Sequence, residues 1–285
     1  MKAAANPGEI IDGRYQVIRL IDRGSMADVF EAYDSAGKRG VALKVLRGQV
    51  ANDAEALERL KREAQVQSMI SHHNVAGVYG GGATAKGEPY LVVELLQGRS
   101  LRRVVESCGA VSPVHAASYI WQALQGLAAA HQLGVFHRDL KPANLMLEPS
   151  PGPVERVVVI DFGFAAFEGG ARRTKAGHVG GSLGYLAPER LQGDPGSAGA
   201  DIYALGVILY ELLCGQRPFN ANDDLQLINM QLDDIPVPPS QVVPSANIPP
   251  ALEALVMRAL AKEPSQRAAS ALDMANEIEQ AMAGY

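Results

Sequence analysis

One stretch of the chain gathers residue types that suit phosphate chemistry. Positions 137–144 are His-Arg-Asp-Leu-Lys-Pro-Ala-Asn, and Asp161 follows 17 residues after Asn144, at the start of an Asp-Phe-Gly triplet. Carboxylate and amide oxygens are ligands that Mg²⁺ prefers, and lysine neutralises phosphate charge. Phosphoryl transfer needs positioning and charge neutralisation more than covalent chemistry. Asp139, Lys141, Asn144 and Asp161 together suit those tasks.

The elements around these residues change character along the chain. Short β-branched and aromatic runs before residue 96 predict strands over 15–21, 29–33, 41–45, 75–80 and 90–95, with a helix over 53–71 among them. After Gly98 the pattern is mostly helical, and Ser112-Pro113 is a helix-start signal. We expect helices over 113–132, 200–214, 250–262 and 270–282, a buried strand over 157–160 and a proline-rich loop over 236–250.

These motifs, with Ala187-Pro188-Glu189 after them, resemble the eukaryotic-type serine/threonine protein kinase family, in its bacterial branch. Each triplet alone would be a common turn, but their joint order over about 15–281 is specific. The resemblance implies a two-lobed α+β fold. A small antiparallel sheet with one main helix would form the N-lobe (15–96) after an N-terminal extension (1–14). A mostly helical C-lobe would cover 97–285, with ATP in the cleft between the lobes.

The resemblance also implies roles for single residues. Asp139 would accept or orient the proton of the substrate hydroxyl, and Lys141 would neutralise the γ-phosphate, as is typical of the serine/threonine class. Asn144 and Asp161 would hold Mg²⁺, and Mn²⁺ would suit the same ligands. Lys44, in Val-Ala-Leu-Lys, would hold the α- and β-phosphates of ATP. Its expected ion-pair partner is Glu63, on the helix over 53–71.

The glycine-rich loop departs from the family pattern G-x-G-x-x-G-x-V. Positions 22–29 are Asp-Arg-Gly-Ser-Met-Ala-Asp-Val, so only Gly24 remains, and we expect weaker ATP binding than with three glycines. Val93 would be the gatekeeper, and Glu94–Leu96 the hinge that binds adenine through its backbone. The expected nucleotide-contacting residues are Ile21, Asp22, Arg23, Gly24, Ser25, Met26, Ala27, Asp28, Val29, Ala42, Lys44, Val93, Glu94 and Leu96.

The segment between Asp161 and Glu189 resembles the activation segment of the family. Thr174 and Ser182 are its candidate phosphosites, and Ser182 stands where the family usually has a threonine next to the substrate site. Arg138 could pair with a phosphate on Thr174 through a bidentate fork. Two structural roles are also implied: Asp201 would begin the helix that anchors the catalytic loop, and Glu189 would form a buried ion pair with Arg267.

Composition sets broader expectations. The chain has 285 residues, 47% hydrophobic and 20% charged, with a formal net charge of -5, and nothing global points to nucleic acid. Cys108 and Cys214 form no disulfide framework, which suits a reducing cytoplasm. No stretch has the length of a membrane span. Bacterial members of the family often continue into a membrane helix, so this chain could be the intracellular part of a longer membrane-anchored protein. They also pair through the back of the N-lobe, which would make a kinase-domain homodimer.

Two other functions stay open at the level of sequence. A pseudokinase, or nucleotide-binding scaffold, would have the same fold without turnover, and Asp22 and Ala27 are its support. A kinase acting on small molecules is the other alternative. Lys141 and the segment that ends in Ala-Pro-Glu argue against it, because such enzymes generally lack this peptide-docking segment. The preferred function is transfer of the γ-phosphate of ATP to serine or threonine hydroxyls of proteins, including the chain's own activation segment.

Overall fold

The computed structural model describes residues 4–24, 27–46, 64–152, 154–162 and 183–285. It divides into two compact units, and each is described by itself. Residues 1–71 and 76–97 form the first, here called the sheet unit; residues 72–75 and 98–285 form the second, the helical unit. The predicted site residues Ser25, Met26, Glu63, Thr174 and Ser182 lie outside the described residues.

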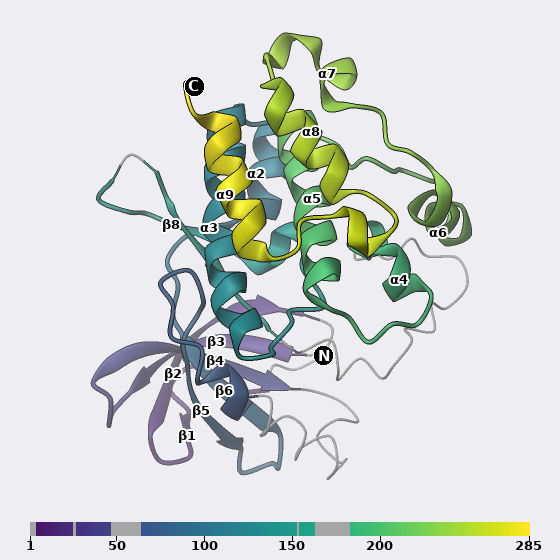
Figure 1. Cartoon of the computed structure of the whole chain (residues 1–285). Helices are drawn as coiled ribbons and strands as arrows, with labels where there is room; N and C mark the ends of the chain where they lie inside the picture. Colours follow the sequence, from purple (N-terminus) through teal and green to yellow (C-terminus); the bar gives the residue numbers. More distant parts are fainter. Residues whose placement is uncertain (1–3, 25–26, 47–63, 153, 163–182) are drawn as a thin grey trace. The chain divides into compact units, whose positions relative to one another are not determined.

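The sheet unit is built on a six-stranded antiparallel sheet (Figure 1). Its spatial order is β1 (Ile10–Ile11), β2 (Tyr15–Arg23), β3 (Ala27–Asp34), β4 (Arg39–Leu46), β6 (Pro89–Glu94) and β5 (Val78–Ala83). Side chains alternate between the two faces of a strand. Val41, Leu43 and Val45 of β4 accordingly join one buried cluster with Phe30 and Ala32 of β3, and the residues between them face the other side.

Residues 4–12 pack onto this sheet. Ala4 and Ala5 are buried in the same apolar cluster. The backbone N–H of Ala4 donates to the carboxylate of Asp28 at 3.0 Å, and the hydroxyl of Tyr90 donates to Asp12 at 2.8 Å. Residues 4–12 therefore belong structurally to the sheet unit.

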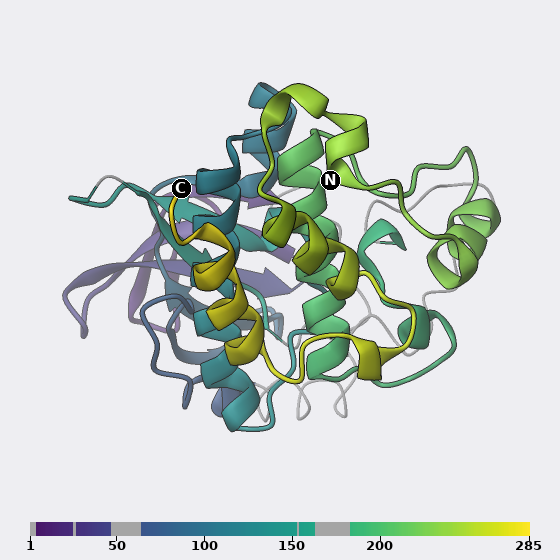
Figure 2. The same cartoon turned by 45° about the horizontal axis from the view of Figure 1, so that its top comes forward.

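The helical unit is organised around α5 (Ala198–Cys214), which is buried along nearly its whole length. Figure 2 shows α3 (Pro113–Gln132), α8 (Pro250–Ala259) and α9 (Ala271–Met282) around it, and these helices pack on one another. The Ser112 side chain caps α3 by accepting from the N–H of His115, as the Ser-Pro signal predicts. The described part of this unit also contains α2 (Leu101–Cys108), α4 (Pro188–Leu191), α6 (Asp224–Asp233) and α7 (Pro239–Val242).

A small three-stranded sheet in the helical unit positions two site residues. β8 (Leu145–Glu148) pairs antiparallel with both β7 (Arg99–Ser100) and β9 (Arg156–Val159), and Leu145 lies opposite Val159. Asn144 precedes β8, and Ile160-Asp161 follow β9. Because the strands are antiparallel, these residues meet at the same end of the sheet.

Two of the predicted elements were wrong in detail. The strand predicted over 75–80 lies at Val78–Ala83, because Val75 instead forms a parallel bridge with Val159 in the helical unit. The stretch 236–250 is not a simple loop: its prolines begin α7 and the 3-10 turn Pro244–Ala246, where a missing N–H costs no helical hydrogen bond. Of the helix predicted over 53–71, residues 64–67 are helical, and positions 53–63 lie outside the described residues.

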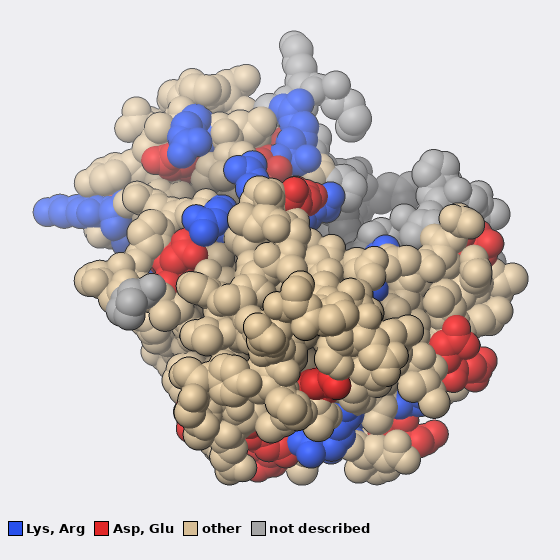
Figure 3. Space-filling view, turned by 90° about the horizontal axis from the view of Figure 1, so that it is seen from above, with Lys and Arg blue, Asp and Glu red and all other residues tan. Residues whose placement is uncertain are grey.

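The described helices include none long and apolar enough to cross a membrane. Figure 3 looks onto the end of the helical unit where α2, α7 and α9 are seen in Figure 1. Much of this face is uncharged, and the blue and red side chains at its margins are interspersed rather than gathered by sign.

Candidate active site

A buried carboxylate at the start of α5 holds the loop that carries the chemistry. Asp201 is 2% exposed and accepts the backbone N–H groups of His137 at 2.8 Å and Arg138 at 3.0 Å. The ring of His131 lies 2.9 Å from the same carboxylate. Arg138 has φ 68°, a left-handed conformation that costs a non-glycine residue about 1–3 kcal/mol. The carboxylate offsets that cost, because it satisfies two consecutive buried N–H groups.

The His137 side chain joins the loop to the end of β9. Its Nε2 donates to the carbonyl of Ile160 at 2.8 Å, and its Nδ1 accepts the N–H of Asp139 at 3.3 Å. These partners fix the neutral tautomer with the proton on Nε2. Its ring also packs against Phe162, with centroids 4.8 Å apart. A buried histidine therefore sets the distance between the loop and the Asp161 segment.

Asp139, Lys141 and Asn144 come together within the loop. The Lys141 ammonium lies 2.6 Å from Oδ2 of Asp139, and both side chains are about one-quarter exposed, at 25% and 21%. The side-chain amide of Asn144 donates to the backbone carbonyl of Asp139 at 2.8 Å. The loop thus presents a partly exposed carboxylate with an ammonium beside it, next to a buried amide.

Asn144 is also tied to the residue before Asp161. The Ile160 N–H donates to the carbonyl of Asn144 at 3.0 Å, which continues the β8–β9 pairing by one step. Asp161 follows directly and has φ 63°, a region that aspartate tolerates better than most residues. The structure therefore brings together Asp139, Lys141 and Asn144. Asp161 directly follows Ile160, the residue that is hydrogen-bonded to Asn144.

The donor set fits a hard divalent cation. The Asn144 side-chain amide donates an N–H to the Asp139 carbonyl, and this hydrogen bond fixes the orientation of the amide. The amide oxygen, Oδ1, is then the atom that can act as a metal ligand. Asp161 supplies carboxylate oxygens. Mg²⁺ in nucleotide enzymes is typically held by one or two such protein groups, with phosphates and water completing its shell.

In the sheet unit, the predicted phosphate-binding lysine lies on a strand face with other predicted site residues. Lys44 pairs with Val29 on β3 and with Leu91 on β6, and Ala42 pairs with Val93. Directly paired residues of antiparallel strands share a face. Lys44, Ala42, Val29 and Val93 therefore lie on one face, opposite the apolar cluster of Val41, Leu43 and Val45.

The base of the glycine-loop hairpin is closed by short-range contacts. The Gly24 N–H donates to the carbonyl of Ala27 at 2.9 Å, and Arg23 lies opposite Asp28, with Nε 3.4 Å from Oδ1. Asp28 is fully buried and also accepts the N–H of Ala4. Asp22 pairs with Val29, so its exposed carboxylate lies on the same face as Lys44. Ile21 is exposed in the same strand, β2.

The predicted hinge follows β6. Glu94 ends that strand; its backbone N–H donates to the Gly77 carbonyl at 2.8 Å, and its carboxylate accepts the Gly77 N–H at 3.1 Å. This pair of contacts fixes the chain where it leaves the sheet. Leu96 lies two residues further on and is half-buried.

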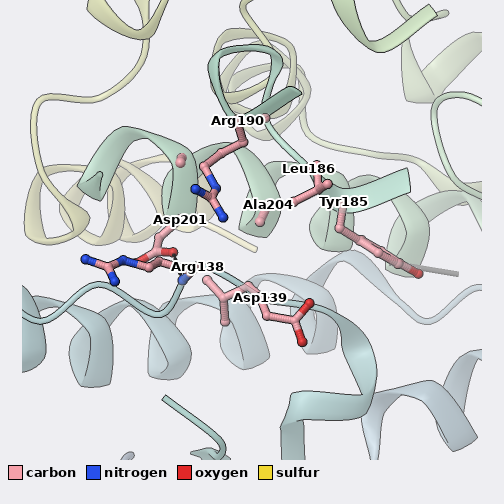
Figure 4. A pocket seen from close by; sticks show the side chains of 10 residues that line it. Arg138, Asp139, Tyr185, Leu186, Arg190, Asp201 and Ala204 are labelled. Carbon is pink, nitrogen blue, oxygen red and sulfur yellow. Dashed lines mark hydrogen bonds between the residues drawn. The ribbon is translucent and has the colours of Figure 1, made fainter. Parts of the chain in front are cut away.

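A small cavity in the helical unit holds two arginines that the chemistry above does not use (Figure 4). Arg138 comes from the loop 137–144 and Arg190 from α4, and Figure 4 shows Arg190 pointing toward Arg138 and Asp201. Within the part of the chain that the structure describes, the Nε atoms of both guanidinium groups are buried without a hydrogen-bond partner. Buried charged donors of this kind favour an anion.

The Ala-Pro-Glu segment is fixed by the ion pair that the sequence predicts. The guanidinium of Arg267 donates to both carboxylate oxygens of Glu189, at 2.7 and 2.9 Å. The arginine side chain is fully buried, and it also donates to the carbonyls of Ala261, Lys262 and Gly199. Because its donors are satisfied, the buried charge is compensated.

Comparison with known proteins identifies this arrangement. The protein kinase domain family model matches residues 15–281. The chain belongs to the protein kinase family. The kinase domain of Mycobacterium tuberculosis PknI has the same fold, with a TM-score of 0.76, 24% sequence identity, and coverage of 98% of this chain and 100% of that one. Members of the family use ATP and a divalent metal.

Curated kinases of three genera are similar in sequence. A probable serine/threonine-protein kinase PknB of Corynebacterium glutamicum is 36% identical over 278 residues, covering 94% of this kinase domain and 42% of that protein. PrkC of Bacillus subtilis is 35% identical, covering 96% and 41%. PknA of Mycobacterium tuberculosis is 36% identical, covering 97% and 63%. The chain thus spans less than half the length of the first two.

Three residues of this site were missed by sequence reasoning. His131 belongs to none of the motifs in the sequence, yet its ring contacts Asp201. Arg190 directly follows the Ala-Pro-Glu triplet, and its position there was the one signal that could have placed it near Arg138. Gln231 makes buried polar contacts with residues 183 and 184, and nothing in its local sequence distinguishes it from a surface glutamine.

Proposed function

We propose that this chain is a serine/threonine protein kinase catalytic domain that transfers the γ-phosphate of ATP to serine or threonine hydroxyls of proteins. The observation that carries the proposal is the loop 137–144, where Asp139 and Lys141 contact each other and Asn144 is hydrogen-bonded to Ile160, the residue before Asp161. The similar proteins that are named serine/threonine kinases support the same chemistry.

Asp139 would orient the substrate hydroxyl and accept its proton, with Lys141 beside it neutralising the γ-phosphate during transfer. Asn144 Oδ1 and the Asp161 carboxylate would hold Mg²⁺, and Mn²⁺ suits the same oxygen ligands. When bound, the metal would neutralise negative charge on the phosphates. The buried Asp201 contact keeps Asp139 in position, because it fixes the two residues before it.

Lys44 would hold the α- and β-phosphates, with Glu63 as its ion-pair partner. Val29, Ala42 and Val93 share its strand face and would contact the nucleotide, and the backbone of Glu94–Leu96 would bind adenine. The hairpin base formed by Arg23, Gly24, Ala27 and Asp28 would place the loop over the phosphates. Kinase-domain pairing through the back of the sheet unit, and a cytoplasmic location, stay predictions of the sequence.

Autophosphorylation at Thr174 would order the activation segment. Arg138 would pair with that phosphate, and the buried Nε atoms of Arg138 and Arg190 in one cavity support an anion there. Thr174→Ala should lower phosphorylation of a second protein, and Ser182→Ala serves as the comparison on the same segment. Equal activity of the Thr174→Ala variant and the wild type toward that protein would overturn this role.

A pseudokinase would have the same fold, and Asp22 and Ala27 in the glycine loop favour it. Phosphate transfer from labelled Mg²⁺-ATP to a generic protein substrate, followed by phosphoamino-acid analysis, separates the two functions. We expect phosphoserine or phosphothreonine from wild type and none from Asp139→Asn. Absence of label with wild type would favour the pseudokinase, and phosphotyrosine would contradict the serine/threonine class.

A further inference from the structure

A buried glutamine joins α6 to the backbone just before Ala-Pro-Glu. Gln231 is 1% exposed, and its Nε2 donates to the carbonyl of Gly184 at 2.7 Å and to that of Leu183 at 3.5 Å. Its Oε1 accepts the hydroxyl of Tyr203 on α5. A primary amide has two donor hydrogens and one acceptor oxygen, so these contacts use both ends of the side chain.

The backbone around this glutamine is held separately. The Lys262 ammonium donates to the carbonyls of Met230 at 3.0 Å and Gln231 at 2.7 Å, close to the C-terminal end of α6. The Met230 carbonyl also accepts the backbone N–H of Asp234, and a lysine beside the last carbonyls of a helix stabilises the helix end. The same ammonium lies 4.4 Å from the centre of the Phe219 ring. Both the backbone and the side chain of Gln231 are therefore fixed.

Arg267 contacts both Tyr203 and Lys262, the two residues that hold Gln231. Its guanidinium lies 4.9 Å from the centre of the Tyr203 ring and donates to the carbonyl of Lys262 at 2.8 Å, in addition to its pair with Glu189. The segment 183–189 is thus tied to one scaffold at both ends, near its start by Gln231 and at its end by Arg267.

We propose that Gln231 is a positioning residue for the protein substrate. The partners of its side chain among the described residues are Leu183, Gly184 and Tyr203, so it would act by fixing the backbone of Leu183 and Gly184 rather than through the reacting atoms. The inference rests on the proposed kinase function, which puts this segment beside the substrate hydroxyl. Because Gln231 bonds to main-chain carbonyls, it would set the geometry of the docking segment for any peptide side chain.

Gln231→Leu tests the proposal, because it keeps the approximate volume and removes both the donor and the acceptor. It leaves the Gly184 carbonyl and the Tyr203 hydroxyl buried without this partner. We expect kcat/KM for a serine-containing model peptide to fall at least about tenfold. The KM for ATP and the rate of ATP hydrolysis without peptide should stay within about twofold. Gln226→Leu is the matched control, the same change at an exposed position of the same helix, and should behave as wild type.

Gln231→His should restore peptide phosphorylation, since a neutral imidazole keeps one donor and one acceptor. Thermal unfolding of each variant identifies any that does not fold. If Gln231→Leu fails that check, Gln231→Glu, which keeps the acceptor and lacks the amide donor, replaces it. Unchanged peptide kcat/KM, or an equal loss of ATP hydrolysis and peptide phosphorylation, overturns the inference. A wild type without ATP hydrolysis or phosphotransfer overturns the proposed function instead.

Discussion

At the scale of single residues, a carboxylate at a glycine-loop position adds a negative charge to the strand face that is predicted to bind phosphate. Asp22 stands where the family pattern has its first glycine, and the register places it on the same strand face as Lys44. A negative charge near bound phosphates disfavours them, and the cost depends on screening by salt. The loop hairpin keeps its closed base, so the charge rather than the backbone should decide affinity.

Asp22→Gly should therefore tighten ATP binding, by about three- to tenfold at low ionic strength for about 1 kcal/mol of repulsion. Asp22→Asn removes the charge alone and should give most of the gain. Calorimetric titration with Mg²⁺-ATP at two salt concentrations measures both, and the gain should shrink at high salt. Equal affinities of wild type and both variants would show that Asp22 does not face the nucleotide.

Glu211, which accepts a hydrogen bond from Tyr185, should make the free energy of unfolding depend on pH. Burial raises the pKa of its carboxyl above the ordinary 4.5, while hydrogen bonding from Tyr185 opposes that shift. At pH values between 4.5 and the raised pKa, the Glu211 carboxyl keeps its proton in the folded state and has lost it in the unfolded state. The contribution of Glu211 to the free energy of unfolding consequently falls as pH rises through that window.

Glu211→Gln cannot titrate, so its unfolding free energy relative to wild type should increase with pH across the window and then level off. Urea unfolding at several pH values between about 4 and 8 measures this difference. Glu279→Gln, the same change at an exposed position on α9, is the control. A difference for Glu211→Gln that does not change with pH would contradict the buried carboxyl described here.

At the scale of elements, the close approach of α5 and α8 depends on a glycine. A Cβ on Gly206 would lie 2.8 Å from the Cβ of Ala259, closer than real side chains come. Ala is ordinarily the better helix former, by about 1 kcal/mol. Packing should outweigh that preference, because the helices must separate to admit the methyl group.

We expect Gly206→Ala to lower the free energy of unfolding by about 1–3 kcal/mol in urea titrations. Gly199→Ala, on the same helix with its nearest neighbour at 3.6 Å, should be neutral or stabilising. Adding Ala259→Gly to Gly206→Ala should recover part of the loss. A Gly206→Ala variant as stable as Gly199→Ala would refute the close helix contact.

Short sequence patterns predicted the helices and strands that are determined by their own residues. The Ser112-Pro113 signal predicted the start of α3, and the short β-branched run over 41–45 predicted β4. Val75 was misassigned because its partner, Val159, is 84 positions away in the sequence. The strand Val78–Ala83 contains three glycines with low strand propensity, and it is held by its pairing with β6. Pairing over long sequence separations cannot be obtained from periodicity.

The same distinction applies to the site. The residues 137–144 and 161 could be predicted because they are contiguous motifs, and Glu189–Arg267 because the family pairs them. The contacts of Gln231 and Arg190 join segments far apart in sequence, and single glutamines and arginines are common on surfaces. Only the three-dimensional contacts distinguish these residues from surface ones.

At the scale of the whole molecule, the proposed chemistry is divided between two units. The sheet unit contains Lys44 and the predicted adenine-binding residues, and the helical unit contains Asp139, Asn144 and Asp161. The proposed function would need groups from both units, so a measurement of phosphate transfer by the whole chain tests it directly. Assays limited to nucleotide binding would not test it, because a pseudokinase could also bind ATP.

The most direct measurement is intact-mass and peptide mass spectrometry of the purified chain after incubation with Mg²⁺-ATP, beside an Asp139→Asn control. We expect wild type to gain phosphate on Thr174 or neighbouring hydroxyls with time, and the control to gain none. Absence of phosphate on the wild type, on itself and on an added protein substrate, would contradict the kinase assignment. Equal phosphate on the Asp139→Asn variant would contradict the role given to Asp139.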